Sequence, residues 1–197
     1  DVYKRQSEFE TAQVISDFNT VENEFQSLSV VEMVENQANK TPEALALYFR
    51  DKSWTYEEIN SWSNEIANEL ITKYNIKSGG RVAVMLDRSE HSVVVMLAIL
   101  KTGASYVPVD YQYPVSRIDF ILNDAGVDLL ITQKGLEDIP TIKIPETLFV
   151  DQENEVVYSK ENPKVDIKLD SESFVIYTSG STGNPKGVMQ TLSLIHI

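Results

Sequence analysis

The sequence predicts an α/β fold with a mainly parallel sheet flanked by helices. Between residues 44 and 132, short apolar segments alternate with segments of helical periodicity. This alternation is typical of parallel strands that are covered by helices on both faces. The composition of the 197 residues, 42% hydrophobic and 24% charged, is that of a folded globular chain.

The first expected elements are a helix, a strand and a longer helix. An apolar repeat of helical period starts after Ser27, and Pro42 ends it. Residues 44–49 are a strand candidate. Thr55 and Glu58 form a capping box, in which each side chain accepts the backbone amide of the other residue. The apolar stripe that follows predicts a long amphipathic helix.

The middle of the chain is expected to alternate strand and helix. Strands are expected at residues 81–86, 106–109 and 127–132, and helices at residues 90–101 and between Pro114 and Gly126. Gly103 suits a left-handed cap, and Pro114 suits a first helical turn. Residues 134–169 are interrupted by prolines, and only residues 147–150 predict a strand there. A last apolar strand is expected at residues 173–177.

Charge and composition exclude several classes of function. The chain has 17 Lys and Arg against 30 Asp and Glu, a formal net charge of -13, which repels nucleic acid phosphates and anionic lipid. Its longest purely apolar run, residues 93–100, is far shorter than the roughly 18 residues of a membrane span. The absence of cysteine excludes disulfides and thiolate metal sites. We therefore expect no nucleic acid partner, no membrane association and a cytoplasmic location.

Two isolated polar residues are better explained by local structure than by chemistry. His91, beside Glu90 at the expected start of a helix, is expected to be solvated. Asp110 is expected to form a turn at the end of its strand.

The terminal hexapeptides, residues 1–6 and 192–197, are expected to be sequencing-adapter remnants and not native protein. Residues 1–6 can be encoded as GAT GTG TAT AAG AGA CAG, and the reverse complement of that DNA encodes residues 192–197. Two unrelated native tails would show this complementarity only by coincidence. We therefore expect residues 7–191 to be an internal fragment of a longer protein, and both hexapeptides to make few contacts.

Residues 178–187 are the segment whose residue types most clearly indicate a binding site. They directly follow an expected strand and combine hydroxyls, glycines and a lysine: Thr178, Ser179, Gly180, Ser181, Thr182, Gly183, Asn184, Pro185, Lys186 and Gly187. Glycines let backbone N–H groups approach an anion closely, hydroxyls add donors, and lysine supplies positive charge. We expect a loop that binds nucleotide phosphates; a flexible surface loop is the alternative.

This pattern differs from the common P-loop, which needs Gly-Lys-Ser/Thr directly before a helix. Here Lys186 precedes Gly187, and an apolar pair, Val188 and Met189, follows. The pattern therefore indicates a different class of nucleotide-binding protein.

Residues 177–188 resemble the phosphate-loop signature of the adenylate-forming superfamily, the AMP-dependent synthetases and ligases. Residues 100–110, LKTGASYVPVD, with Tyr113, Pro114 and Arg117 after them, resemble the second core motif of nonribosomal peptide synthetase adenylation domains. Residues 54–60, WTYEEIN, resemble the first core motif. The departures are Trp54, Thr102 and Tyr111, where the family often has leucine, alanine and a small residue or proline, and none of them touches the loop.

The resemblance identifies residues 27–191 as the N-terminal part of such an adenylation domain, with part of the N-terminal subdomain of the adenylate-forming fold. Residues 7–26 are acidic and polar, and we expect them to be a linker from an upstream condensation-type domain, because residues 15–20, with Phe18 and Asn19, are similar to such a linker.

The resemblance also implies an activity. The intact enzyme would use ATP and Mg2+ to form an aminoacyl-adenylate, and would then load the amino acid onto a carrier-domain phosphopantetheine thiol. ATP would be bound by Thr178, Ser179, Gly180, Ser181, Thr182, Gly183, Lys186 and Gly187. The magnesium ligand, the catalytic lysine and the amino acid pocket would lie after Thr191, so no catalytic or metal residue is assigned and the fragment alone is expected to be inactive. The expected partners are the amino acid and the carrier and condensation domains of the same megaenzyme.

Two alternatives remain open. One is an acyl-CoA or D-alanine carrier-protein ligase of the same superfamily, against which residues 104–108 argue. The other is a non-catalytic binding module that retains the fold. The sequence after Thr191 in the native protein would distinguish them.

Overall fold

The structure, a computed structural model, describes residues 7–19, 28–136, 140–141, 144, 146–152, 156–179 and 185–192. The helices are α1 (Glu8–Ile15), α2 (Val30–Lys40), α3 (Tyr56–Thr72), α4 (Glu90–Lys101) and α5 (Val115–Ala125), with a 3-10 turn at Asp17–Asn19. The strands are β1 (Leu45–Phe49), β2 (Lys52–Thr55), β3 (Arg81–Val84), β4 (Ser105–Pro108), β5 (Leu129–Thr132), β6 (Thr147–Phe149), β7 (Glu172–Thr178) and β8 (Lys186–Thr191).

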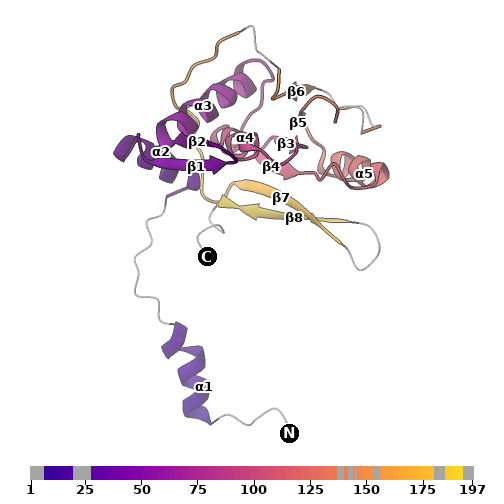
Figure 1. Cartoon of the computed structure of the whole chain (residues 1–197). Coiled ribbons are helices and arrows are strands. Elements are labelled where there is room, and N and C mark those ends of the chain that lie inside the picture. Colours follow the sequence, from indigo (N-terminus) through magenta and orange to yellow (C-terminus); the bar gives the residue numbers. More distant parts are fainter. Residues whose placement is uncertain are drawn as a thin grey trace.

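The predicted α/β fold is confirmed. Six of these strands form one sheet in the order β6-β5-β3-β4-β7-β8, flanked by helices (Figure 1). Each neighbouring pair in it is parallel except β7 and β8, which are antiparallel. The sheet is therefore mixed but mainly parallel.

Helices cover both faces of this sheet. On one face, Val95 and Ile99 of α4 pack with Leu70 of α3 against β3 and β5. On the other face, Ile118 and Ile121 of α5 pack against β3, β4 and β5. The chain passes from β3 through α4 to β4, and then back through α5 to β5 on the far side of β3. The strand order therefore reverses between β3 and β4, and ligands of open α/β sheets bind outside the carboxyl ends of the strands at such a position.

Capping boxes start three of the helices. The expected box is confirmed at α3, where the Thr55 amide donates to the Glu58 carboxylate at 2.8 Å and the Glu58 amide donates to the Thr55 hydroxyl at 3.3 Å. Ser29 forms the same box with Glu32 at α2. Ser7 forms another with Glu10, so the expected linker at 7–26 contains the helix α1. The Ser-x-x-Glu spacing is the sequence signal for α1, and the prediction of a linker overlooked it.

Strand β2 is a second difference from the expectation, which placed only one strand before α3. Residues 45–55 form an antiparallel hairpin, with Phe49 opposite Lys52. Arg50, in the tight turn, takes a positive φ of 54°. Only Trp54 and Thr55 of β2 are partly buried, so the strand has little of the apolar alternation that predicts strands.

The first residue of the second terminal hexapeptide corrects one expectation. Leu192 is 2% exposed, packs with Val31 and Leu100, and donates its amide to the Ser171 carbonyl oxygen. The expectation of few contacts is therefore wrong for this residue, because an apolar side chain at the end of β8 fills a core position. Residues 1–6 and 193–197 lie outside the described residues, and the origin of both hexapeptides stays a prediction.

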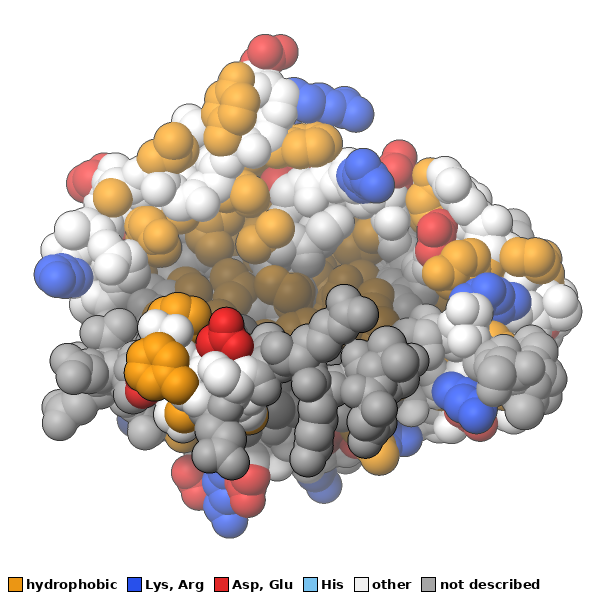
Figure 2. Space-filling model, turned by 90° about the horizontal axis from the view of Figure 1, so that it is seen from below, with side chains coloured by type: hydrophobic (Ala, Val, Ile, Leu, Met, Phe, Trp, Pro, Cys, Tyr) orange, Lys and Arg blue, Asp and Glu red, His pale blue; other side chains and the backbone are white. Residues whose placement is uncertain are grey.

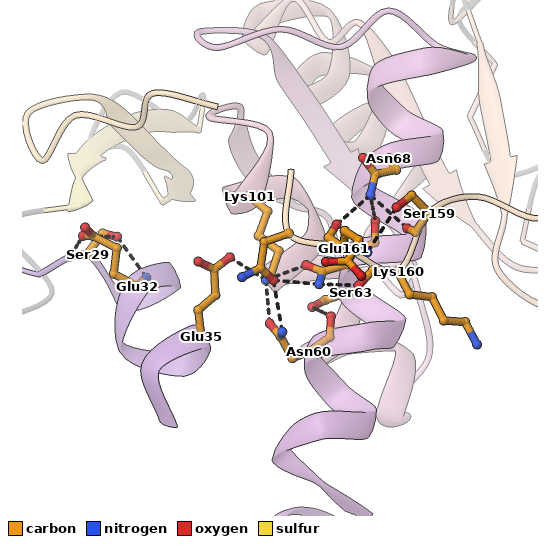
Figure 3. A network of polar contacts seen from close by, with 12 residues as sticks. Ser29, Glu32, Glu35, Asn60, Ser63, Asn68, Lys101, Ser159, Lys160 and Glu161 are labelled. Atoms are coloured by element: carbon orange, nitrogen blue, oxygen red, sulfur yellow. Dashed lines mark hydrogen bonds and ion pairs between the residues drawn. The ribbon is translucent and has the colours of Figure 1, made fainter. Parts of the chain in front are cut away.

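A buried lysine links three helices to a distant segment (Figure 3). The Lys101 ammonium, 1% exposed, lies 2.8 Å from a Glu35 carboxylate oxygen and 2.7 Å from the amide oxygens of Asn60 and Asn64. Asn64 donates to the carbonyl oxygen of Lys160 at 2.8 Å and to the side chain of Asn162 at 2.7 Å. The network fastens the segment between β6 and β7 along α3.

The surface of the molecule shows where apolar side chains remain uncovered. In Figure 2, hydrophobic side chains gather in the hollowed middle of one face, and charged side chains lie mostly toward its margins. Figure 1 shows α1 apart from the sheet, and Phe9, Ile15 and Phe18 are each at least 66% exposed. Among the described residues, no helix has the length and apolar character that a membrane span requires.

Candidate phosphate-binding site

The ends of the expected phosphate loop are held by a β-hairpin. Strand β7 leads into the loop and β8 returns from it, with Thr178 opposite Lys186 and Tyr177 opposite Gly187. The side chains of Thr178, Ser179 and Lys186 are exposed. The structure thus brings together both described ends of the predicted site, while Gly180, Ser181, Thr182 and Gly183 lie outside the described residues.

Strand β8 stands where the sequence predicted the end of a loop. Lys186 and Gly187 are strand residues, and the strand continues through the apolar pair to Thr191. Val188 is 44% exposed and Met189 is 61% exposed, so neither is a core residue in the described structure. Backbone pairing with β7, not burial, holds β8 in place, and a pattern of buried residues therefore could not predict it.

Tyr177 lies directly before the loop and contacts two other elements. Its hydroxyl donates to the Asp124 carboxylate in the last turn of α5, at 2.7 Å. The residue is 8% exposed and packs in the core beneath α5. Burial first, and the hydrogen bond to Asp124 second, raise the pKa of the Tyr177 hydroxyl. The hydroxyl therefore stays protonated and remains a donor.

Gly187 fits against the ring of Tyr177. A Cβ atom at this position would lie 3.1 Å from Cζ of Tyr177 and 3.3 Å from its hydroxyl oxygen and from Cγ1 of Val175. These distances are shorter than ordinary van der Waals contacts. The absence of a side chain at Gly187 is thus explained by packing between the two hairpin strands, in addition to the loop shape that the sequence suggested.

A cleft of about 280 Å³ lies beside the loop end of this hairpin. Strands β4 and β7 pair at Tyr106 and Phe174. The cleft is lined by Val84 at the carboxyl end of β3, by Val109 and Asp110 after β4, and by Ile176 and Tyr177 near the carboxyl end of β7. It therefore lies at the sheet edge where a ligand is expected in this type of fold.

Asp110 and His91, the two isolated polar residues of the sequence, both have contacts within the fold. The Asp110 carboxylate accepts the Gln112 amide at 2.8 Å, which confirms the expected turn. His91 is half-buried and lies edge-on to Trp62 with ring centroids 5.0 Å apart, so the expectation of a solvated side chain is wrong. Burial against the tryptophan lowers the pKa of His91. Within the described ranges there is no cluster of three or more His, Cys, Asp or Glu side chains that could hold a metal ion.

Sequence comparison assigns the hairpin and the sheet to one family. Residues 34–195 match the family of AMP-binding enzymes. The chain belongs to the AMP-binding enzyme family. This match, together with relatives that are nonribosomal peptide synthetases, confirms the resemblance to their adenylation domains.

Relatives of this AMP-binding chain include two curated synthetases. It is 36% identical over 184 residues to gramicidin S synthase 2 of Brevibacillus brevis, covering 93% of this chain and 4% of that protein. It is 40% identical over 187 residues to a dimodular nonribosomal peptide synthase of Bacillus subtilis (strain 168), covering 92% of this chain and 8% of that protein. The chain thus spans less than a tenth of each of these relatives.

Solved structures show the same fold. The nonribosomal peptide synthetase FmoA3, in its α-methyl-L-serine-AMP bound form, superimposes with a TM-score of 0.77 at 26% identity, over 88% of this chain and 20% of that one. A fatty acyl CoA synthetase of Mycobacterium tuberculosis superimposes with a TM-score of 0.74 at 24% identity, over 85% of this chain and 35% of that one. The second likeness is one of fold alone.

Proposed function

We propose that this chain supplies the phosphate-binding loop of an enzyme that activates an amino acid with ATP. The carboxylate would attack the α-phosphate, form an aminoacyl-adenylate and release pyrophosphate. The thiol of a carrier-domain phosphopantetheine would then attack the acyl carbon of the adenylate, forming the thioester with release of AMP. The family match and the peptide synthetase relatives support this proposal, and they favour carrier and condensation domains as its partners.

One observation carries the role of the loop. The hairpin places the Lys186 backbone opposite Thr178, so a cation and hydroxyl donors flank the loop at the end of β7. In-line transfer at the α-phosphate builds negative charge on the departing pyrophosphate. Positioned donors and a lysine stabilise that charge more in the transition state than in the ground state.

The proposed binding residues divide by chemistry. Thr178, Ser179, Ser181, Thr182 and Lys186 would contact the phosphates, and Gly180, Gly183 and Gly187 would allow the backbone to fit around them. ATP is the substrate, and the Mg2+ that accompanies it is proposed to have its protein ligand outside this segment. No catalytic residue is proposed within the chain.

The test is a Lys186→Ala substitution in the intact enzyme that contains this segment. We expect the rate of adenylate formation to fall roughly a hundredfold or more at saturating ATP, with little change in the KM for the amino acid. Lys168→Ala, at an exposed lysine in the segment between β6 and β7, is the matched control and should keep the wild-type rate. An unchanged rate in the Lys186 variant would refute the phosphate-binding role.

A second measurement uses the chain by itself. The proposal places the catalytic and amino acid pocket residues outside residues 1–197. The isolated chain should therefore show no amino-acid-dependent exchange of pyrophosphate into ATP above a control without enzyme. Clear exchange would overturn that placement.

A further inference from the structure

Tyr177, directly before the phosphate loop in the sequence, connects three parts of the fold. It is the residue before Thr178 on the incoming strand, and its ring packs against Gly187 on the outgoing strand. Its hydroxyl reaches Asp124 on α5 at 2.7 Å. One side chain thus joins both strands of the hairpin to a helix on the adjacent face of the sheet.

Asp124 occupies an unfavourable position for a helix residue. It lies in the last turn of α5, which ends at Gly126 in the left-handed conformation. An acidic side chain at this end is repelled by the partial negative charge of the helix carbonyl groups. A residue that breaks a local preference is expected where tertiary structure or function compensates for it. Here the described compensation is the hydrogen bond from Tyr177.

The helix under Asp124 is a rigid support. Ile118 and Ile121 of α5 are 0% exposed, and Leu122 is 1% exposed. The guanidinium of Arg81 also donates to the Ala125 carbonyl oxygen at 2.9 Å, which fixes the helix end to β3. A hydrogen bond from this support therefore restricts the position of Tyr177 and of the strand that carries it.

We propose that Asp124 and Tyr177 are positioning residues, which hold the two strands of the hairpin, and with them Thr178 and Lys186, in the arrangement that binds phosphate. This inference rests on the proposed function, because the hydrogen bond between Tyr177 and Asp124, here called the anchor, would support the proposed phosphate-binding loop. Neither residue contacts the phosphates in this assignment. Both act through the backbone of the hairpin.

Amide hydrogen exchange on the chain tests the anchor directly. In Tyr177→Phe, which keeps the ring and removes the hydroxyl, we expect exchange to become about tenfold faster at those amides that pair β7 with β8 next to the loop, as the loss of one buried hydrogen bond predicts. Asp124→Ala should have the same effect. Asp124→Asn should largely restore protection, since its amide oxygen can still accept the bond.

The control is a buried hydroxyl on a strand away from the hairpin. Thr132, on β5, is fully buried and donates to the Met85 carbonyl oxygen at 3.0 Å. Thr132→Val removes one buried hydrogen bond in the same sheet. We expect it to lower the thermal midpoint to a similar extent but to leave exchange at the paired hairpin amides unchanged. Equal exchange in Tyr177→Phe and in wild type, or equal effects of Thr132→Val and Tyr177→Phe on these amides, would overturn the proposal.

Titration with MgATP separates this inference from the proposed function. We expect the Kd of the chain for MgATP to rise about tenfold in Tyr177→Phe and Asp124→Ala, and to stay at the wild-type value in Thr132→Val. If the wild-type chain binds no MgATP, the proposed function loses support while the exchange result still decides the anchor. Faster exchange with an unchanged Kd would overturn the role of the anchor in phosphate binding.

Discussion

The guanidinium of Arg81 makes a two-point contact with the carboxylate of Glu172. Nε lies 2.9 Å from Oε1 and Nη2 lies 3.0 Å from Oε2. Arg81 opens β3 and Glu172 opens β7, so the pair spans the intervening strand β4 at the amino ends of the sheet. The two parallel N–H···O bonds of such a guanidinium–carboxylate pair make the contact strong and directional. The contact joins the strand that leads into the loop to the centre of the sheet.

This pair predicts a pH dependence of stability. Burial is the largest single effect and raises the pKa of Glu172, but the hydrogen bonds and positive charge of Arg81, together with a hydrogen bond from Ser105, outweigh it and hold the pKa below its ordinary value of 4.5. The folded chain therefore keeps this carboxylate charged to a lower pH than the unfolded chain does. Its contribution to the free energy of unfolding is present above pH 4.5 and is lost as the pH falls through the folded-state pKa.

Glu172→Gln should remove this contribution. We expect the free energy of unfolding of the variant to decline less steeply than that of wild type between about pH 5 and pH 3. Urea denaturation at a series of pH values measures the difference. Glu43→Gln, at an exposed carboxylate, should keep the wild-type slope. Identical slopes in the Glu172 variant and in wild type would contradict the pairing.

Lys101 predicts a large loss of stability upon substitution. Its three ammonium hydrogens face three oxygen acceptors, and the side chain is 1% exposed. Burial lowers the pKa of Lys101, and Glu35 opposes that shift. Lys101→Met would leave the Glu35 carboxylate and two amide oxygens without their donor. We expect a loss of about 3 kcal/mol in the free energy of unfolding.

Lys77→Met is the control for Lys101, because Lys77 is an exposed lysine. It should change the free energy of unfolding by no more than about 0.5 kcal/mol. Denaturant unfolding of the two variants gives the comparison. Similar small losses in both would show that the buried network does not stabilise the fold.

The elements that the sequence predicted are those with a strong local signal. The helix α3 was predicted from its capping box and apolar stripe, and α4 and β5 from continuous apolar runs. Elements held mainly by backbone pairing gave no such signal. Strand β8 is exposed along most of its length, and β2 is half-buried only at its end.

The candidate site likewise has a part that the sequence predicts and a part that it does not. The loop was predicted because its residue types suit phosphate within one short segment. The contact between Tyr177 and Asp124 joins residues 53 positions apart, and no spacing rule relates a strand residue to a helix end in another part of the chain. The Lys101 network likewise draws on residues from α2, α3 and the segment before β7. Contacts of this kind follow only from the packing of the elements.

Substitution of Gly103 is expected to lower the stability of the fold for two separable reasons. Its φ of 73° lies in the left-handed region, and a Cβ there would lie 2.9 Å from Oγ of Ser78. Gly126 has a φ of 61° with nothing within 4 Å of such a Cβ. Gly126→Ala should therefore cost about 1 kcal/mol for the conformation alone, whereas Gly103→Ala should cost more. Thermal unfolding ranks the two, and equal losses would mean that Ser78 moves aside freely.

Substitutions at Gly187 and Tyr177 are expected to have coupled effects on the free energy of unfolding. Because Gly187 has no positive φ, the cost of alanine there should come from its contact with the tyrosine ring and with Val175. Gly187→Ala should lower the free energy of unfolding by about 1 to 2 kcal/mol in the wild-type background. In a Tyr177→Ala background the ring is absent, and the same substitution should cost much less.

The double-mutant cycle between these residues therefore measures their contact. We expect a coupling free energy of about 1 kcal/mol in denaturant unfolding, within the usual range for side chains that touch. Gly187→Ala combined with Thr132→Val serves as the control cycle, because β3 and β4 separate the strand of Thr132 from the hairpin, and its two costs should add. If the Gly187 and Tyr177 costs also add, the glycine is not required by the tyrosine ring, and the shape of the loop becomes the better explanation for it.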